Sequence, residues 1–407
     1  MLTKIQIKGY KSLRDARVNL NSLTVFLGKN NVGKSNLFDA LRLVSNLAKM
    51  PVIAAFAPMN HRGDPNESFF KSGATDTLSF VLDLNLSAAP HPYKKGERLT
   101  HVFFQYEVHI RYSSESGSLT VISETLSGRT KDGKKSKSFI EQQGGKTIVN
   151  RDIGSGNNRK FDSPANRSVL LMIDDAELYP SVCAVREELA SWKFFHFEPQ
   201  ALREPSQKIN IAELETDGRG LSGFYDTLSR TDAARFEAAK AGLRRAIPEA
   251  KELDTVETGD NRKLLRLIRQ DGEAFTARVM SDGTLRFLAL LALAHAPSPP
   301  RLVCFEEPEN GVHPSRLKFT VDALRAIAAE TEHGAACQVL VNSHSPYLVD
   351  QLNPDEVVLV VNEKGETRFQ NVSQELFADK PFIKTMLESG EQTLGEVWAA
   401  EGLDYVG

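Results

Sequence analysis

A glycine-rich segment near the N-terminus has the residue types and spacing that bind phosphate. Residues 28–35 read G-K-N-N-V-G-K-S, with the two glycines, four spacers and Lys-Ser pair of a phosphate-binding loop. The glycines let main-chain N–H groups turn toward phosphates. Lys34 would supply a charge to the β- and γ-phosphates, and the Ser35 hydroxyl can bind Mg²⁺. The residues predicted to bind ATP are Gly28, Asn30, Asn31, Gly33, Lys34, Ser35 and Asn36.

Two adjacent acids follow an apolar run later in the chain. Residues 301–305 read as a buried strand, which ends at Glu306 and Glu307. In a phosphate-loop protein, a carboxylate at the end of a neighbouring strand can hold magnesium, and we expect Glu306 to do so directly or through water. Glu307 would polarise the attacking water. The alternative is an acidic cluster on the surface that binds nothing.

Two further motifs are weaker when taken alone. Met280 to Arg286 precede an apolar helix, with Ser281 suited to cap it and Gly283 leaving main-chain N–H groups open, as in an anion-binding helix start. Most such segments are only helix caps. His344 follows the apolar strand pattern V-L-V-N, although a lone histidine is usually structural.

The surrounding patterns predict an α/β fold that brings these residues together. An apolar strand at 23–27 precedes the loop, and apolar residues at helical spacing follow it from 37 to 47. Helix and strand patterns alternate again over 284–341, which is typical of a mostly parallel sheet covered by helices. Residues 78–149 predict an antiparallel meander, and residues 264–279 a hairpin around Asp271-Gly272.

The order of the motifs resembles the ABC-type ATPase head. Within it, the chain is most similar to the branch of SMC, RecF and OLD (overcoming-lysogenization-defect) ATPases, and there to the compact stand-alone "predicted ATPase" proteins. The segments that carry the resemblance span nearly the whole chain: IKGYKSLRDARVNL, FLGKNNVGKSNLFDALR, WKFFHFEPQALREPS, LETDGRGLSGFYDTL, MSDGTLRFLALLALAH, FEEPENGVHP and VNSHSPYLVD.

The resemblance implies a role for each motif. Glu306 would be the Walker B acid, Glu307 the catalytic base and His344 a switch histidine, with Ser35 and Glu306 holding Mg²⁺. The implied signature loop, which touches ATP on a partner subunit, comprises Ser281, Asp282 and Gly283. The implied D-loop comprises Asn310 and Gly311. Two departures stand out: Glu replaces the commoner Asp in Walker B, and residues 49–278 offer no anchored Q-loop glutamine.

Three regions are expected along the chain. Residues 1–175 would form an N-terminal ATPase lobe with the loop and the meander, residues 176–260 a helical insert, and residues 261–407 a C-terminal ATPase lobe with the other motifs and a tail. Residues 129–160 read as a basic loop, with nine Lys or Arg against three acids, and make DNA a candidate partner. The net charge of −3 gives no global attraction to nucleic acid.

Composition bounds the location and the kind of protein. Three widely spaced cysteines form no disulfide framework, and the longest apolar run, 287–294, is too short for a membrane span, so a cytoplasmic protein without membrane contact is expected. About sixty residues follow His344 without the acids of a Toprim nuclease. We therefore expect a dimer or higher oligomer that controls a separate effector, such as a nuclease.

The leading hypothesis is an ATP-hydrolysing switch that acts in DNA repair or maintenance, or in defence against phage and plasmids. One alternative is a nucleotide-dependent scaffold with slow turnover. Another is the nucleotide-binding subunit of a transporter, which would be expected to carry Leu-Ser-Gly-Gly-Gln rather than Met-Ser-Asp-Gly-Thr. The meander and the tail from Ser373, with Phe377, Phe382, Leu387 and Trp398, are the candidate partner surfaces, although the tail's apolar residues could equally pack on the core.

Overall fold

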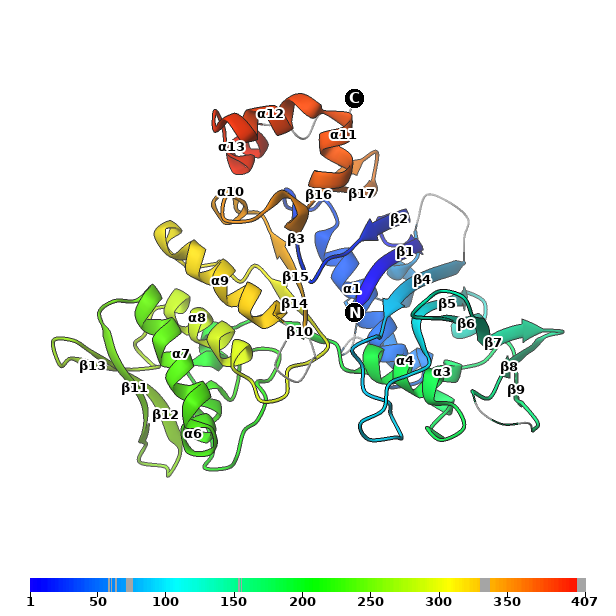
Figure 1. Cartoon of the computed structure of the whole chain (residues 1–407), viewed down its shortest axis with the longest axis horizontal. Helices are drawn as coiled ribbons and strands as arrows, with labels where there is room; N and C mark the ends of the chain where they lie inside the picture. The colour runs from blue at the N-terminus through cyan, green and yellow to red at the C-terminus, as the bar shows by residue number, and fades with distance from the viewer. Residues whose placement is uncertain are drawn as a thin grey trace.

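Three β-sheets organise the part of the chain that the computed structural model describes (Figure 1). That part comprises residues 1–57, 59, 61–62, 64–70, 76–152, 154, 156–329 and 337–400. In Figure 1, a central sheet lies between a large antiparallel sheet on the right and a small three-stranded sheet with its helices on the left. The predicted α/β fold with a mostly parallel sheet and an antiparallel meander is confirmed.

The central sheet has six strands, in the order β10-β14-β15-β3-β16-β17. Their bounds are Lys193–Phe195, Leu302–Glu306, Gln338–Ser343, Leu23–Leu27, Val357–Glu363 and Glu366–Asn371. Every pair is parallel except β16 and β17. Because parallel strands end at the same edge of a sheet, the loops that follow β3, β14 and β15 meet there.

Both faces of this sheet are buried, which explains its nearly continuous apolar strands. Phe26 and Leu340 belong to a core shared with α1 (Lys34–Leu47) and α4 (Pro180–Ala190). Their neighbours Val25 and Val339 point the other way, into a core shared with α8 (Asp282–Ala294) and α9 (Leu317–Ala328). This alternation fixes the register, since a shift of one residue would exchange the two faces.

The antiparallel sheet has eight strands, in the order β2-β1-β4-β5-β6-β7-β8-β9. Their bounds are Leu13–Asn19, Leu2–Tyr10, Thr77–Asn85, His101–Ser113, Ser118–Thr130, Ser136–Gln143, Lys146–Val149 and Arg159–Asp162. The N-terminal hairpin β1-β2 therefore joins the predicted meander rather than the central sheet.

The expected basic loop over 129–160 is wrong where β7, β8 and the start of β9 run through it. Phe139, Ile140 and Val149 are buried, and this burial outweighs the low strand propensity of the lysines, serines and glutamines around them. Lys137 donates hydrogen bonds to the main-chain oxygens of Arg151 (2.6 Å) and Asp152 (3.1 Å). At least this lysine is therefore engaged within the fold.

The third sheet packs with helices in the region expected to be a helical insert. Helices α6 (Leu221–Thr231) and α7 (Ala233–Ala246) lie beside β11 (Ala250–Glu257), β12 (Lys263–Arg269) and β13 (Ala274–Thr276). The β12-β13 hairpin matches the prediction, whereas β11 was not predicted. The range 176–260 also contains β10, an edge strand of the central sheet, and the domain boundaries remain a prediction.

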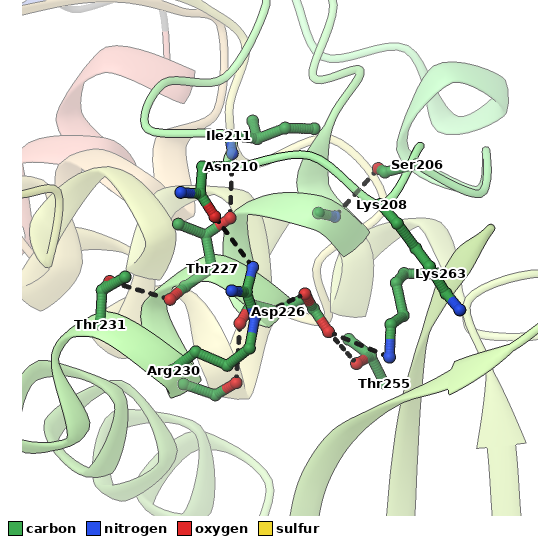
Figure 2. Close-up of polar contacts among 12 residues, drawn as sticks. Ser206, Lys208, Asn210, Ile211, Asp226, Thr227, Arg230, Thr231, Thr255 and Lys263 are labelled. Carbon is green, nitrogen blue, oxygen red and sulfur yellow. Dashed lines mark hydrogen bonds and ion pairs between the residues drawn. The ribbon is translucent and has the colours of Figure 1, made fainter.

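A polar network around Asp226 ties α6 to this small sheet (Figure 2). The Asp226 carboxylate accepts hydrogen bonds from Thr255 Oγ1 (2.9 Å) and Arg230 Nε (3.1 Å), and Lys263 Nζ lies 3.5 Å away. Burial alone would raise the pKa of Asp226, but the hydrogen bonds from Thr255 and Arg230 and the charge of Lys263 outweigh it, and the pKa is lowered.

Asp226→Ala should therefore destabilise the protein by about 1–3 kcal/mol near neutral pH, because a half-buried ionic network loses its acceptor. With its pKa lowered in the fold, Asp226 contributes fully above its unfolded pKa of about 3.9, and the contribution is lost as the pH falls through the folded value. Urea unfolding of both proteins measures the difference, which should shrink on acidification.

The matched control is Asp260→Ala in the same region, where an exposed aspartate lies 3.7 Å from Arg262. This change should alter the free energy of unfolding by less than about 0.5 kcal/mol. Equal losses in the two variants, or a difference that grows as the pH falls, would contradict a stabilising role for the Asp226 network.

The C-terminal segment packs on the central sheet at β3 and β16. Helix α10 (Pro346–Val349) connects β15 toward β16, and helices α11 (Phe377–Asp379), α12 (Pro381–Ser389) and α13 (Leu394–Ala399) follow β17. Buried Ile383, Leu394 and Val397 pack with Leu359. Phe377, Leu387 and Trp398 pack partly buried against the same core, while Phe382 is exposed. Three of the four apolar residues named from the sequence thus pack on the core, and Phe382 does not.

The remaining elements are short. Helices α2, α3 and α5 comprise Val52–Ala55, Val169–Met172 and Pro199–Leu202. Three short 3₁₀ helices comprise Pro65–Ser68, Pro314–Arg316 and Pro354–Glu356, and a π-helix comprises Val372–Leu376. Among the described residues, no helix combines the length and apolar character that crossing a membrane requires.

Candidate functional site

The glycine-rich loop joins β3 to α1 and surrounds the Lys34 side chain. Asn31 and Gly33 have positive φ angles of 66° and 105°, which turn the loop back over its own main chain. Lys34 Nζ donates to the carbonyl oxygens of Gly28 (2.5 Å) and Lys29 (2.7 Å). Burial lowers the pKa of Lys34, against the opposing charges of two nearby acids. The ammonium thus lies inside the curve of the loop, where phosphate-binding lysines act.

Residues far away in sequence hold this loop in place. Thr367 Oγ1, on β17, donates to the Val32 carbonyl (2.8 Å) and lies 2.6 Å from Ser12 Oγ, which accepts from Asn36 Nδ2 (2.7 Å). A Cβ on Gly33 would lie 2.0 Å from Thr367 Oγ1. The second glycine of the loop is therefore required by space as well as by its positive φ. Neither Ser12 nor Thr367 was predicted as a site residue, although Ser12 lies within the quoted segment IKGYKSLRDARVNL.

Glu306, the last residue of β14, lines the same cavity as the loop and lies between an arginine and a histidine. Arg62 Nη2 lies 3.6 Å from its Oε1, and His196 Nδ1 lies 3.7 Å from its Oε2. His196 directly follows β10, the neighbour of β14. A histidine therefore lies beside Glu306, in the range where the sequence offered no anchored Q-loop glutamine. Neither Arg62 nor His196 was predicted as a site residue, although His196 lies within the quoted segment WKFFHFEPQALREPS.

Glu307 is held by two other residues that the motifs singled out. Its Oε1 lies 3.0 Å from His344 Nδ1, and its Oε2 accepts a hydrogen bond from Asn310 Nδ2 at 2.6 Å. Its main chain has a φ of 48°, and its N–H donates to the Asn342 carbonyl (3.0 Å). Two side chains therefore orient the carboxylate and the end of β15 holds the main chain, as expected of a group that must act on a water at a fixed place.

The predicted signature loop lies against the predicted D-loop. Ser281 Oγ accepts from the Thr284 N–H and caps α8, and Arg203 pairs with Asp282 at 2.6 Å. A Cβ on Gly283 would lie 2.3 Å from the Gly311 carbonyl oxygen, so this close approach requires a glycine. Arg286, in the first turns of α8, donates to the Asn310 carbonyl at 2.5 Å.

One cavity of about 530 Å³ unites the loop with the two acids. It is lined by Ser12, Asn30, Asn31, Gly33, Lys34, Ser35, Asn36, Arg62, His196, Glu306, Glu307, Asn342 and Asn362. Eight of these residues were predicted from the sequence. The lining within the described part of the chain does not include Ser281, Asp282 or Gly283, so the signature loop stands apart from the cavity of its own chain.

The donor set fits a magnesium ion that also binds phosphate. Ser35 and Glu306 both line the cavity and offer hard oxygen ligands, and Mg²⁺ is commonly held by one or two protein oxygens together with phosphates and waters. No group of three or more His, Cys, Asp or Glu side chains among the described residues forms a complete metal cage. A metal here would therefore depend on the nucleotide for much of its coordination.

Comparison with known proteins identifies the class. Residues 23–350 match the family described as "AAA domain, putative AbiEii toxin, Type IV TA system", and the chain belongs to this family. The fold is similar to an SMC head bound to the C-winged helix domain of ScpA, with a TM-score of 0.57 and 12% identity over 93% of this chain and 99% of that chain.

A second similar structure is an SMC head with an extended coiled coil, bound to the C-terminal domain of ScpA from Pyrococcus furiosus. Its TM-score is 0.51 at 13% identity, over 95% of this chain and 99% of that chain. No curated protein matches the chain. Family and fold together define an ABC/SMC-type head among the P-loop ATPases. The resemblance to an ABC-type ATPase head is confirmed, whereas the lack of a Toprim nuclease remains an expectation.

Proposed function

We propose that this chain binds ATP with Mg²⁺ in the described cavity and hydrolyses it when two copies meet around the nucleotides. The observation that carries the proposal is the convergence of Lys34, Ser35, Glu306 and Glu307 on one cavity, with His344 Nδ1 3.0 Å from Glu307 Oε1. These residues follow three adjacent parallel strands, so the rigid sheet sets their spacing.

The loop and Lys34 would bind the phosphates. An ammonium has three protons, and two of those on Lys34 are engaged by loop carbonyls, which aims the side chain and leaves the third for a phosphate oxygen. The start of α1 adds main-chain N–H groups at its positive end. Ser35 and Glu306 would hold Mg²⁺, which when bound neutralises phosphate charge.

Glu307 would accept the proton of the attacking water. Asn310 and His344 occupy one oxygen each of its carboxylate, which orients the group while leaving lone pairs for the water. His344 Nδ1, 3.0 Å from Glu307 Oε1, would help to hold the carboxylate in one orientation. This arrangement is that of a general base with an orienting partner.

A second copy would complete the site through its signature loop. The start of α8 presents open N–H groups and a positive helix end, and Ser281 and Asp282 are exposed. Because this loop stands apart from the cavity of its own chain, phosphate contact would come from the opposing subunit. A two-fold dimer would then hold two equivalent composite sites.

Mixing two inactive variants tests this arrangement. Ser281→Arg spoils the signature loop, and Lys34→Ala spoils the phosphate loop, so each alone should lose hydrolysis. In an equal mixture half of the dimers are mixed, and each has one intact composite site, so activity should recover to at most about a quarter of the wild-type rate.

Ser389→Arg, at an exposed serine at the end of α12, is the control and should keep wild-type activity. Absence of recovery under conditions where mixed dimers are shown to form would rule out completion of the site in trans. Activity of Ser281→Arg alone would exclude the signature role.

We extend the proposal to the output of the switch: ATP-dependent dimerisation would control a separate effector protein, in defence against foreign DNA or in DNA maintenance. Support comes from the family description, which includes a toxin of a type IV toxin–antitoxin system, and from SMC heads whose solved structures contain the partner ScpA. A change in dimer geometry can bias a bound partner only if that partner prefers one state.

A further inference from the structure

Asn342 is a buried amide whose hydrogen-bonding groups find no partner in the fold. It lies near the end of β15, where only 3% of the residue is exposed. Neither its Oδ1 nor its Nδ2 has a hydrogen-bond partner among the described residues. The side chain lines the cavity that also contains Lys34 and the two acids.

Another amide on the same strand behaves in the opposite way. Gln338, with 1% of the residue exposed, donates from Nε2 to the carbonyls of Leu2 (2.7 Å) and Asn21 (3.0 Å) and accepts from the Leu2 N–H (2.8 Å). The amide of Gln338, at the start of β15, thus has hydrogen-bond partners. The amide of Asn342, where the strand meets the cavity, has none among the described residues.

An unsatisfied buried amide costs free energy, because its groups have left water without gaining new partners. An apolar side chain of similar size would cost less there, as the neighbouring residues Val339, Leu340 and Val341 illustrate. The cost is recovered if a ligand enters the cavity and supplies the missing partners.

We propose that Asn342 binds the terminal phosphate of the nucleotide and so distinguishes a nucleoside triphosphate from a diphosphate. This inference rests on the proposed function. Asn342 lies opposite Glu306 in the parallel register, and its own carbonyl accepts from the Glu307 N–H (3.0 Å). It therefore belongs to the wall of the cavity that carries the metal-binding acid and the base, where the phosphate that is cleaved must lie.

The chemistry of an amide suits this place. Nδ2 can donate to an anionic phosphate oxygen, and Oδ1 can accept from a water that approaches it. A lysine here would pair with Glu306 or Glu307, and a carboxylate would add a third negative charge. A neutral donor thus contacts the phosphate without disturbing the two acids.

The test replaces Asn342 by leucine, which has a similar shape and no hydrogen-bonding groups. The nucleotide-free variant should melt a few °C higher than the wild type, because an unsatisfied amide is removed. Its affinity for a non-hydrolysable ATP analogue should fall about tenfold, while its affinity for ADP should stay within about twofold. Thermal unfolding and calorimetric titration measure these effects.

Gln338→Leu is the matched control on the same strand. It should melt lower than the wild type, since it leaves main-chain groups without partners, and should keep the ratio of the two affinities. If Asn342→Leu does not fold, Asn342→Ala takes its place in the titrations, with the same expected loss for the triphosphate alone.

An equal loss of affinity for both nucleotides in Asn342→Leu, or a lower melting temperature with an unchanged affinity ratio, would make Asn342 a structural residue. Either result would overturn this inference and leave the proposed function in place. A wild-type protein that binds neither nucleotide would overturn the proposed function as well. The two failures are therefore distinguishable from the same titrations.

Discussion

Replacing Lys34 by alanine should lower the affinity for ATP by about a hundredfold or more, because a hydrogen bond to a charged group contributes about 1.5–3 kcal/mol and Lys34 would bridge two phosphates. The ammonium is already aimed by the carbonyls of Gly28 and Lys29 and is largely removed from water. Little reorganisation is then needed when a phosphate enters, so the loss on truncation should be large. Hydrolysis should fall to background.

Lys29→Ala is the matched control, since Lys29 is an exposed lysine of the same loop. We expect its affinity for ATP to stay within about threefold of the wild type, because its contact with Lys34 comes from the main chain and the side chain lies outside the cavity lining. Titration with a fluorescent ATP analogue compares the three proteins. Ordinary ATP affinity in Lys34→Ala would remove this lysine from the phosphate site.

The part of the site that could be predicted is the part encoded by local spacing. The phosphate loop needs only eight consecutive residues between a strand and a helix, and Glu306 and Glu307 follow directly from an apolar strand. Their meeting could also be expected, because parallel strands deliver their following loops to one edge. Asn310 and His344 were implied by the resemblance, and the structure places both on Glu307.

The unpredicted residues reach the cavity through pairings that the sequence does not display. Thr367 lies on β17, the edge strand of the central sheet, and reaches the phosphate loop only because of the order of the strands in that sheet. Ser12 lies in the turn between β1 and β2 of the antiparallel sheet. Arg62 and His196 flank Glu306 from segments more than a hundred residues away in sequence. Each contact depends on tertiary packing rather than on any local pattern.

The incorrect prediction over 129–160 has a related cause. Lysine, serine and glutamine favour loops by composition, yet β7 pairs with β6 through Ile140 opposite Leu126. Phe139 and Ile140 are fully buried, and their burial makes this segment a strand rather than a loop. A short apolar pair among polar residues carries too little periodicity to indicate a strand from sequence alone.

Glu307→Gln should leave ATP binding within about threefold of the wild type and lower the rate of hydrolysis by about 100- to 10,000-fold, the usual contribution of a general base. Glutamine keeps the length and shape of the side chain, and its carbonyl oxygen can still accept from Asn310 Nδ2, which lies 2.6 Å from the carboxylate. Only the capacity to take a proton from water is lost. An ATP-bound dimer should therefore accumulate, and size-exclusion chromatography with light scattering should detect it with ATP but not with ADP.

The control is Glu363→Gln on β16, where the carboxylate pairs with Arg368 at 2.8 Å away from the cavity lining, and its turnover should equal that of the wild type. The trapped Glu307→Gln dimer also gives access to the effector, because a partner that prefers the ATP state has no hydrolysis to release it. Co-expression with the neighbouring gene product should then yield a complex with ATP that ADP weakens. Turnover of Glu307→Gln at the wild-type rate would show that another group activates the water, and the Glu307–His344 contact of 3.0 Å would then be structural.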